Sequence, residues 1–298
     1  MNCHTPQIDS LLREALIEDQ ATHDVTTQLT VDANLRGTAR ILARQEMIVC
    51  GLDVIERFFE HFAELGASEA AHACYKVEIQ PGIADGVRVQ DGQVLAVIHH
   101  RAATLLSCER VILNLMQHLS GIATEVRRYV DAIEGTGARL LDTRKTIPGL
   151  RVLEKYAVAC GGGTNHRLDL ASGILIKNNH IALGGGVRAA VGHALAGRMP
   201  GLRVQVEVRT PEELEDALTA GAEAVLLDNM TPEEVRRAVA RIHAATAGKA
   251  QIPAEASGGI TLASIRSYAE AGADFISVGA LTHSVPAADI SMRIELEN

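Results

Sequence analysis

Apolar residues recur every three or four positions in several parts of the chain, and this spacing predicts helices. One such stretch covers residues 7–19 and another covers 53–65. A longer stretch over 103–131 predicts a long helix that is interrupted near Ser120-Gly121. The long helix is expected to carry the chain from a first domain into a second.

Strands are predicted where apolar and polar residues alternate. Residues 38–50 and 75–98 show this alternation, and Asp91-Gly92 before the run 94–98 predicts a hairpin turn. The acidic segment 18–27 is expected to form a turn. The first part of the chain therefore predicts a mixed α+β domain over 1–115.

From residue 138 onward, short apolar runs alternate with helical segments, and each run leads into a polar or small residue. These residues are Lys145, Lys177, Glu207, Asp228, Ser257 and Gly279. Such repeats form a doubly wound sheet or a barrel, and chemistry at the carboxyl ends of strands is typical of barrels. A complete barrel typically needs ~250 residues, so we predict an open, incomplete α/β barrel over 116–284.

Composition and charge narrow the classes of function. A hydrophobic share of 47% and a charged share of 22% are ordinary for globular proteins. The net charge of −9 opposes binding to nucleic acid or an anionic membrane, so an anionic substrate needs local positive charge. Five dispersed cysteines argue against a disulfide framework or zinc site. Without a signal sequence or membrane-spanning stretch, we expect a soluble cytoplasmic protein.

Cations cluster at two places in the second half. Thr143-Arg144-Lys145 follows the first run, and Arg offers a fork for a carboxylate while Lys offers a point charge. His166-Arg167 follows the glycines 161–163. A helix C-cap explains one or two glycines but not the cations beside them. Solvated surface cations remain the alternative for Arg144 and Lys145.

Lys177, Glu207 and Asp228 each end a run. Lys177 could bind an anion, form a Schiff base, or reach past the barrel rim to water. The two acids could hold Mg²⁺ directly or through water, bind ribose hydroxyls, or stabilise a developing cation. The alternative is that both acids form ion pairs with the nearby cations.

Small residues follow the last two strands and predict a phosphate site. They are Ser257, Gly258, Gly259, Val278, Gly279 and Ala280. Such residues let backbone N–H groups approach a phosphate, and a helix N-terminus adds partial positive charge. The glycines 184–186 indicate only a flexible loop, and the remaining histidines and cysteines show no ligand spacing.

These motifs together resemble the quinolinate phosphoribosyltransferase family over nearly the whole chain. The blocks are Glu18-Asp19, Asp24–Thr27, Glu109-Arg110 to Asn114, Leu119–Thr124, Asp142–Thr146, Gly161–Arg167, Ile176–His180, Glu207-Val208, Leu227–Asn229, Glu255–Gly259 and Ser277–Ala280. The resemblance implies an N-terminal α/β sandwich before the open barrel, with 285–298 packed against the sandwich. It also implies a homodimer in which Arg110 reaches the neighbouring subunit's active site.

The resemblance implies transfer of phosphoribose from phosphoribosyl pyrophosphate to quinolinate. Quinolinate would lose carbon dioxide, giving nicotinate mononucleotide and pyrophosphate for NAD synthesis. The quinolinate-binding residues would be Arg110, Thr143, Arg144, Lys145, His166, Arg167 and Lys177. Phosphoribosyl pyrophosphate would meet Glu207, Asp228, Ser257, Gly258, Gly259, Val278, Gly279 and Ala280. Lys145, Lys177, Glu207 and Asp228 would be catalytic, with Mg²⁺ held mainly by pyrophosphate.

Four rival functions remain open. A related pyrophosphorylase-like protein linked to molybdate transport would use another acceptor. A nicotinate phosphoribosyltransferase would hold one carboxylate and release no carbon dioxide. A Schiff-base aldolase would use Lys177, and an anion-binding protein would show no turnover. The doubled set of cations for a dicarboxylate favours quinolinate.

Overall fold

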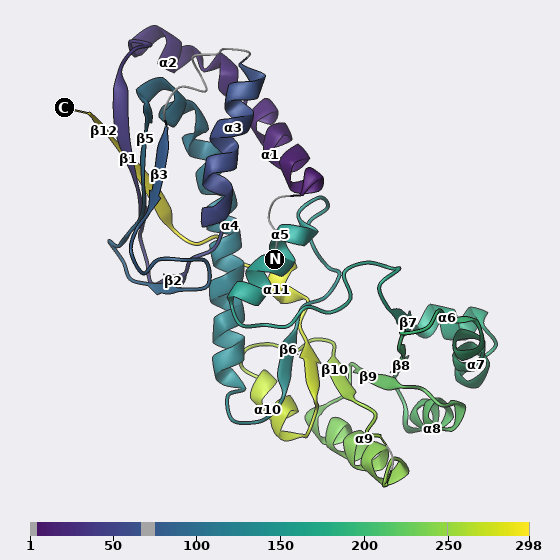
Figure 1. Ribbon diagram of the computed structural model, residues 1–298. Coiled ribbons are helices and arrows are strands. Elements are labelled where there is room, and N and C mark those ends of the chain that lie inside the picture. Colours follow the sequence, from purple (N-terminus) through teal and green to yellow (C-terminus); the bar gives the residue numbers. More distant parts are fainter. Residues whose placement is uncertain (1–4, 67–74, 249, 298) are drawn as a thin grey trace. The chain divides into compact units, whose positions relative to one another are not determined.

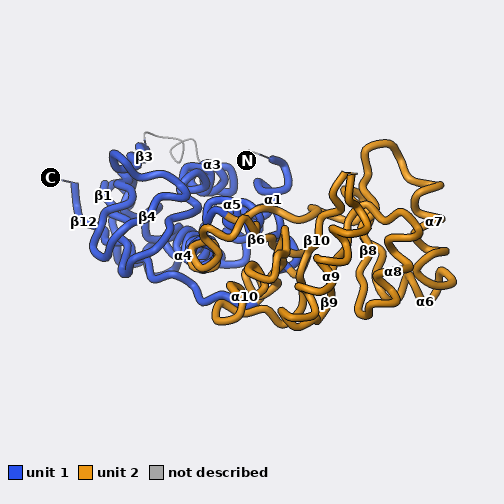
Figure 2. The backbone as a smooth tube through the Cα atoms, turned by 90° about the horizontal axis from the view of Figure 1, so that it is seen from below, with its two compact units in different colours: residues 1–127, 146–162, 284–298 blue, residues 128–145, 163–283 orange. Residues whose placement is uncertain are grey.

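The computed structural model describes residues 5–66, 75–248 and 250–297, so Cys3 and Cys74 lie outside the described residues. Two compact units divide the chain (Figure 2). The first unit comprises Met1–Arg127, Thr146–Gly162 and Ser284–Asn298, and the second comprises Arg128–Lys145 and Gly163–His283. Within the described ranges, no helix is long and apolar enough to cross a membrane.

The first unit is built on an antiparallel sheet with strand order β12-β1-β5-β3. The strands are β1 (Arg36–Ala43), β3 (Lys76–Ile79), β5 (Val94–Arg101) and β12 (Ile290–Leu296). Alternate residues of β1 are buried, which is the period-two pattern of a sheet with one face against a core. Ile41 lies opposite Met292 of β12, so the end of the chain completes this sheet.

The predicted hairpin at Asp91-Gly92 is wrong in its pairing. The short strand β4 (Arg88–Val89) pairs with β2 (Met47–Ile48), whereas β5 pairs with β1 and β3. The turn itself forms, but its backbone binds the end of β1: Gly92 donates to the carbonyl of Ala43 at 2.9 Å. The turn therefore directs β5 onto β1 and leaves β4 in a separate two-stranded sheet.

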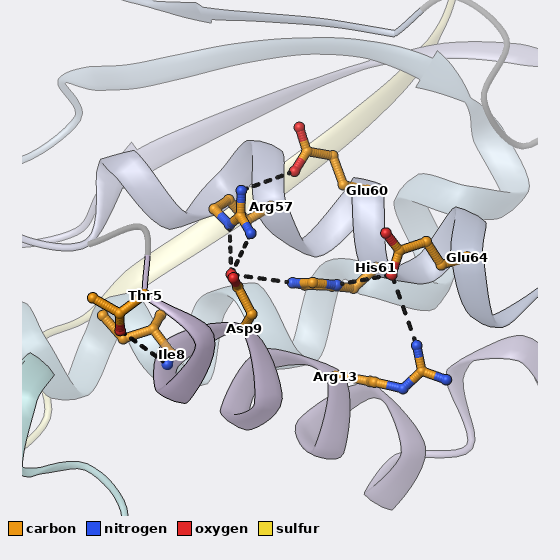
Figure 3. A network of polar contacts seen from close by, with 8 residues as sticks. All are labelled: Thr5, Ile8, Asp9, Arg13, Arg57, Glu60, His61 and Glu64. Carbon is orange, nitrogen blue, oxygen red and sulfur yellow. Dashed lines mark hydrogen bonds and ion pairs between the residues drawn. The ribbon is translucent and has the colours of Figure 1, made fainter. Parts of the chain in front are cut away.

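Helices α1 (Pro6–Glu18) and α3 (Ile55–Leu65) confirm the two predicted amphipathic helices. A short 3₁₀ turn, η2 (Leu52–Val54), precedes α3. Asp9 of α1 joins the two helices, because it accepts a hydrogen bond from Nε of Arg57 at 2.8 Å (Figure 3). Nε2 of His61 lies 3.5 Å from the same carboxylate.

The acidic segment that was expected to be only a turn contains helical structure. The 3₁₀ turn η1 (Ala21–His23) leads into the helix α2 (Val25–Thr30). Asp24 is the N-cap of α2, and its Oδ1 accepts the backbone N–H of Thr27 at 3.0 Å. A side chain that satisfies the first free N–H groups of a helix explains why an acid occupies this place.

Helix α4 (Ala102–Ala132) is continuous, so the predicted interruption at Ser120-Gly121 is wrong. Gly121 lies inside the helix at a place where another segment packs so closely that no side chain fits. A Cβ at Gly121 would collide with the carbonyl oxygen of Pro286. The glycine therefore marks a close approach within the first unit, which also contains α5 (Arg151–Cys160).

The second unit contains a six-stranded parallel sheet with order β6-β11-β10-β9-β8-β7. The strands are β6 (Arg139–Leu141), β7 (Ile174–Ile176), β8 (Val204–Val208), β9 (Ala224–Asp228), β10 (Ala254–Ser257) and β11 (Phe275–Ser277). All six predicted runs are strands. Since β6 and β7 are the two edges, the predicted open α/β barrel is confirmed.

Helices connect these strands and lie beside the sheet (Figure 1). They are α6 (Asn178–Leu183), α7 (Val187–Gly197), α8 (Pro211–Ala220), α9 (Pro232–Ala245) and α10 (Ile265–Glu270), and the short helix α11 (Ala280–His283) follows the last strand. On β8, Val204 and Val206 are fully buried, while the alternate residues Gln205 and Glu207 belong to the opposite face. The opposite face therefore carries polar side chains.

The segment after α5 extends the sheet beyond β6. Thr164 lies parallel to Leu141, and its N–H donates to the carbonyl of Leu140 at 2.8 Å. Nη1 of Arg167 then donates to the carbonyl of Gly173, just before β7, at 2.9 Å. Arg167 thus ties the segment beside β6 to the residue that precedes β7.

Candidate active site

The cationic part of the site is tied to the end of β6 by a buried acid. Asp142 is fully buried, and its Oδ1 accepts the backbone N–H of His166 at 2.7 Å. This bond holds the segment that carries His166 and Arg167 beside the strand end that carries Thr143 and Arg144. Two sequence motifs that are more than twenty residues apart are thereby brought together.

Arg144 and Arg167 place two positive charges in a partly buried setting. Nε of Arg144 is buried and has no hydrogen-bond acceptor among the described residues. Burial lowers the pKa of the Arg167 guanidinium, and the positive charge of Arg144 lowers that pKa further, while Asp169 opposes the shift. Like charges that repel and a donor that lacks an acceptor both favour the arrival of an anion.

The two lysines lie at strand ends and are exposed. Lys145 runs over Gly279, since a Cβ at Gly279 would lie 2.9 Å from Cδ of Lys145. Oγ1 of Thr143 accepts the backbone N–H of Lys145 at 3.0 Å. Lys177 follows β7, and its exposure suits anion binding better than the desolvated amine of Schiff-base chemistry.

Glu207 and Asp228 occupy the ends of the neighbouring strands β8 and β9. Their ion-pair partner is Arg209, which sequence reasoning missed. Nε of Arg209 lies 3.0 Å from Oδ2 of Asp228, and Nη2 lies 3.5 Å from Oε1 of Glu207. The signal available in the sequence was its place directly after a strand, the same position that singled out the other site residues.

The two small-residue loops are neighbours because β10 and β11 pair in parallel, with Ser257 beside Ser277. Gly258 has φ +100°, and a Cβ there would collide with the amide of Asn229. Gly259 has φ +63° but faces open space. Helix α11 begins at Ala280, directly after the second loop, whereas α10 begins only at Ile265. No helix begins directly after the first loop, so its backbone N–H groups for a phosphate would come from the loop and not from a helix N-terminus.

A second residue that sequence reasoning left without a role is Glu255 of β10. It is 4% exposed, and Oε2 accepts a hydrogen bond from the Gln205 amide at 2.8 Å. Nε2 of His166 lies 3.4 Å from the same oxygen. These three residues line a cavity of about 460 Å³ together with Arg167. An acid therefore lies beneath the cationic part of the site.

Two further expectations concern Arg110 and the glycines 184–186. Arg110 lies on α4 in the first unit with 60% of its side chain exposed. The glycines that were expected to form a flexible loop make a tight connection, in which Gly184 ends α6 and Gly186 precedes α7.

Among the cysteines, Cys50 and Cys160 approach Asp85 in the first unit, with ligand atoms within 4.8 Å of one another. No sequence spacing could indicate this. Asp85 already accepts hydrogen bonds from the N–H groups of Gly51 and Leu52 and from the Tyr156 hydroxyl. These hydrogen bonds explain the position of the Asp85 carboxylate without a metal ion.

Comparison with known proteins agrees with this geometry. The family model described as quinolinate phosphoribosyl transferase, N-terminal domain, matches residues 24–120, and the C-terminal domain model matches 122–293. A probable nicotinate-nucleotide pyrophosphorylase [carboxylating] of Bacillus subtilis is 42% identical over 98% of this chain and 95% of its own. The nicotinate-nucleotide pyrophosphorylase [carboxylating] of Mycobacterium leprae is 40% identical over 98% of each chain.

A solved structure supports the same assignment. The nicotinate-nucleotide pyrophosphorylase from Francisella tularensis superposes with a TM-score of 0.85 at 37% identity and covers 98% of each chain. The matches extend over both units, and sequence and structure agree. The chain belongs to the quinolinate phosphoribosyltransferase family.

Proposed function

We propose that this chain transfers phosphoribose from phosphoribosyl pyrophosphate to quinolinate with loss of carbon dioxide. The products are nicotinate mononucleotide and pyrophosphate, as NAD synthesis requires. The observation that carries the proposal is that Arg144 and Arg167 lie near one another, and that the buried Nε of Arg144 has no acceptor among the described residues. A small dianion supplies the acceptors that these guanidinium groups need.

Quinolinate is held through its two carboxylates. Arg144 and Arg167 provide the forked donors, and Lys177 adds a point charge from the end of β7. Thr143 and His166 shape the same site, and Lys145 stands between the quinolinate and phosphoribosyl groups. In a homodimer, Arg110 of the neighbouring subunit completes the set of cations.

Phosphoribosyl pyrophosphate binds at the carboxyl ends of the other strands of the open barrel. The loops after β10 and β11 receive the 5-phosphate through the backbone of Ser257, Gly258, Gly259, Val278, Gly279 and Ala280. Glu207 and Asp228 face the ribose and the pyrophosphate. Carboxylate oxygens at two adjacent strand ends fit Mg²⁺, which keeps several waters and binds through one or two carboxylates plus phosphates. Glu207 and Asp228 would hold this ion, which would neutralise charge on the departing pyrophosphate.

The chemistry follows from this placement. Pyrophosphate leaves C1 of the ribose through an oxocarbenium-like transition state, and the pyridine nitrogen of quinolinate attacks that carbon. The C2 carboxylate then departs as carbon dioxide, and the electron pair that it leaves on C2 is stabilised by the adjacent pyridinium nitrogen. A proton from solvent adds to C2 and completes nicotinate mononucleotide. The cations position two anions that repel each other in water, and they bind the transition state more strongly than the ground state.

A comparison of acceptors tests the proposal. Purified protein with phosphoribosyl pyrophosphate and Mg²⁺ is given quinolinate or nicotinate, and products are separated by chromatography. Nicotinate mononucleotide formed from quinolinate only is the expected result. Formation from nicotinate only would replace the proposal with a phosphoribosyltransferase that does not decarboxylate.

A further inference from the structure

Glu255 is a buried acid inside the open barrel of the second unit. Its side chain is 4% exposed, and Oε1 has no hydrogen-bond partner among the described residues. Its other oxygen, Oε2, faces two donors, Nε2 of Gln205 at 2.8 Å and Nε2 of His166 at 3.4 Å. Burying a carboxylate is costly unless it is hydrogen-bonded, so a role beyond packing is needed to explain its presence.

The hydrogen bonds of His166 determine which ring nitrogen carries the proton. Nδ1 accepts the backbone N–H of Arg167 at 2.7 Å, so Nδ1 is an unprotonated acceptor. The ring proton therefore resides on Nε2, which faces Glu255. In the opposite tautomer, Nδ1–H would point at the N–H of Arg167, and two donors would face each other. A carboxylate opposite one ring nitrogen is a common way to select a tautomer.

The ionised form of Glu255 suits this role. Burial alone would raise the pKa of its carboxyl group. Contacts with His166, Ser277 and Gln205 outweigh burial and hold the pKa below its usual value. Glu255 therefore accepts hydrogen bonds at neutral pH.

We propose that Glu255 is a positioning residue for quinolinate. Its carboxylate holds His166 as the Nε2–H tautomer, so that Nδ1 accepts the backbone N–H of Arg167. The backbone of Arg167 is thereby fixed, and its guanidinium lies near Arg144 and donates to the carbonyl of Gly173. This inference rests on the proposed function, because it assigns Arg167 to quinolinate.

Kinetics of two variants test the proposal. Glu255→Ala should raise the KM for quinolinate about 10-fold or more, the effect of a lost buried charged acceptor. The KM for phosphoribosyl pyrophosphate should rise clearly less, because the carboxylate of Glu255 bonds the side chains of His166 and Gln205 and not the backbone N–H groups that receive the phosphate. Glu255→Gln should restore most of the quinolinate affinity, because the amide oxygen still accepts from both His166 and Gln205.

Thr246→Val is the matched control. Thr246 is 4% exposed in the same unit, and its hydroxyl bonds the end of α9 and Gln251. This control should lose stability with no change in the KM for quinolinate. An equal rise in both KM values for Glu255→Ala, or no rise in either, would overturn the positioning role. Failure of Glu255→Gln to restore affinity would also overturn it.

Nitrogen NMR of histidine-labelled protein without substrate separates this inference from the proposed function. His166 should show the Nε2–H tautomer in the native chain. In Glu255→Ala the ring is no longer held against the backbone N–H of Arg167 and should show a mixture of tautomers. The signal is assigned by its loss in His166→Gln. An Nδ1–H tautomer in the native chain would overturn the inference even if Glu255→Ala fails to fold. A protein that shows the expected tautomer but does not use quinolinate would instead overturn the proposed function.

Discussion

Arg209 forms an ion pair with Asp228, in which Nε lies 3.0 Å from Oδ2. The same guanidinium lies 3.5 Å from Glu207. Arg209 is 47% exposed at its side chain, whereas the two acids are 10% and 14% exposed. The cation can therefore turn into water while the acids stay in place. Under the proposed function, Arg209 would be their counter-ion until Mg²⁺ and pyrophosphate bind.

Arg209→Met should lower the magnesium concentration that gives half-maximal activity. Arg209 competes for the two carboxylates, and a measured exposed ion pair typically contributes about 0.2–1 kcal/mol, so the expected change is about 1.4- to 5-fold. Steady-state rates at varied Mg²⁺ measure it. Arg188→Met removes an ion pair with Asp216 elsewhere in the unit and should change nothing. A higher KM for phosphoribosyl pyrophosphate in Arg209→Met would instead mean that Arg209 binds pyrophosphate.

Arg167→Ala should impair quinolinate use far more than binding of phosphoribosyl pyrophosphate. Loss of one good charged hydrogen bond costs about 1.5–3 kcal/mol, which corresponds to about 10- to 150-fold in affinity. Separate titrations with each substrate measure the two effects. Arg167→Lys keeps the charge but not the fork, and should fall between the native chain and Arg167→Ala. An equal loss of both affinities would count against this assignment.

The two adjacent glycines of the first phosphate loop provide an internal comparison. Gly258→Ala should sharply weaken phosphoribosyl pyrophosphate binding, because its Cβ would collide with Asn229 and the backbone φ is +100°. Gly259→Ala meets only the smaller cost of a left-handed backbone, about 1 kcal/mol, because nothing lies near its Cβ. Calorimetric titration with phosphoribosyl pyrophosphate measures both. The loop assignment fails if the two variants bind equally well.

The stability of the first unit should depend on pH through His100. Burial, and then the charges of Arg36 and Arg101, lower the pKa of His100 from 6.5 to about 4. The unfolded chain therefore binds more protons between these values. The contribution of His100 is complete above pH 6.5 and is lost as the pH falls toward about 4.

His100→Phe should consequently flatten the decline in unfolding free energy over this range. Urea unfolding at several pH values measures the decline, with His23→Gln, an exposed histidine of the first unit, as the control. A decline as steep in His100→Phe as in the native chain would show that other groups cause it.

The six strands of the parallel sheet could be predicted because each is a short apolar run with a polar or small residue after it. This is a local pattern, and strands of a parallel sheet covered by helices produce it, even where β8 and β10 carry polar residues on the other face. The site residues at Arg144, Lys177, Glu207 and Asp228 could be selected for the same reason. Their roles came from family resemblance and not from spacing.

Pairing between distant segments could not be predicted in the same way. The turn at Gly92 is local and was predicted. The strand β4 before it pairs with β2, which lies about forty residues earlier in the chain. The contacts of Arg209 with Asp228 and of His166 with Glu255 likewise depend on which strands become neighbours. Gly121 read as a helix break because the close approach of Pro286 has no signal near it in the chain.

The most direct test of the proposed function is an assay with quinolinate that carries a labelled C2 carboxylate, together with phosphoribosyl pyrophosphate and Mg²⁺. The protein should release one labelled carbon dioxide for each nicotinate mononucleotide, and none when phosphoribosyl pyrophosphate is omitted. Mononucleotide formed without labelled carbon dioxide, or no product from folded protein, would show that the chain does not catalyse this reaction.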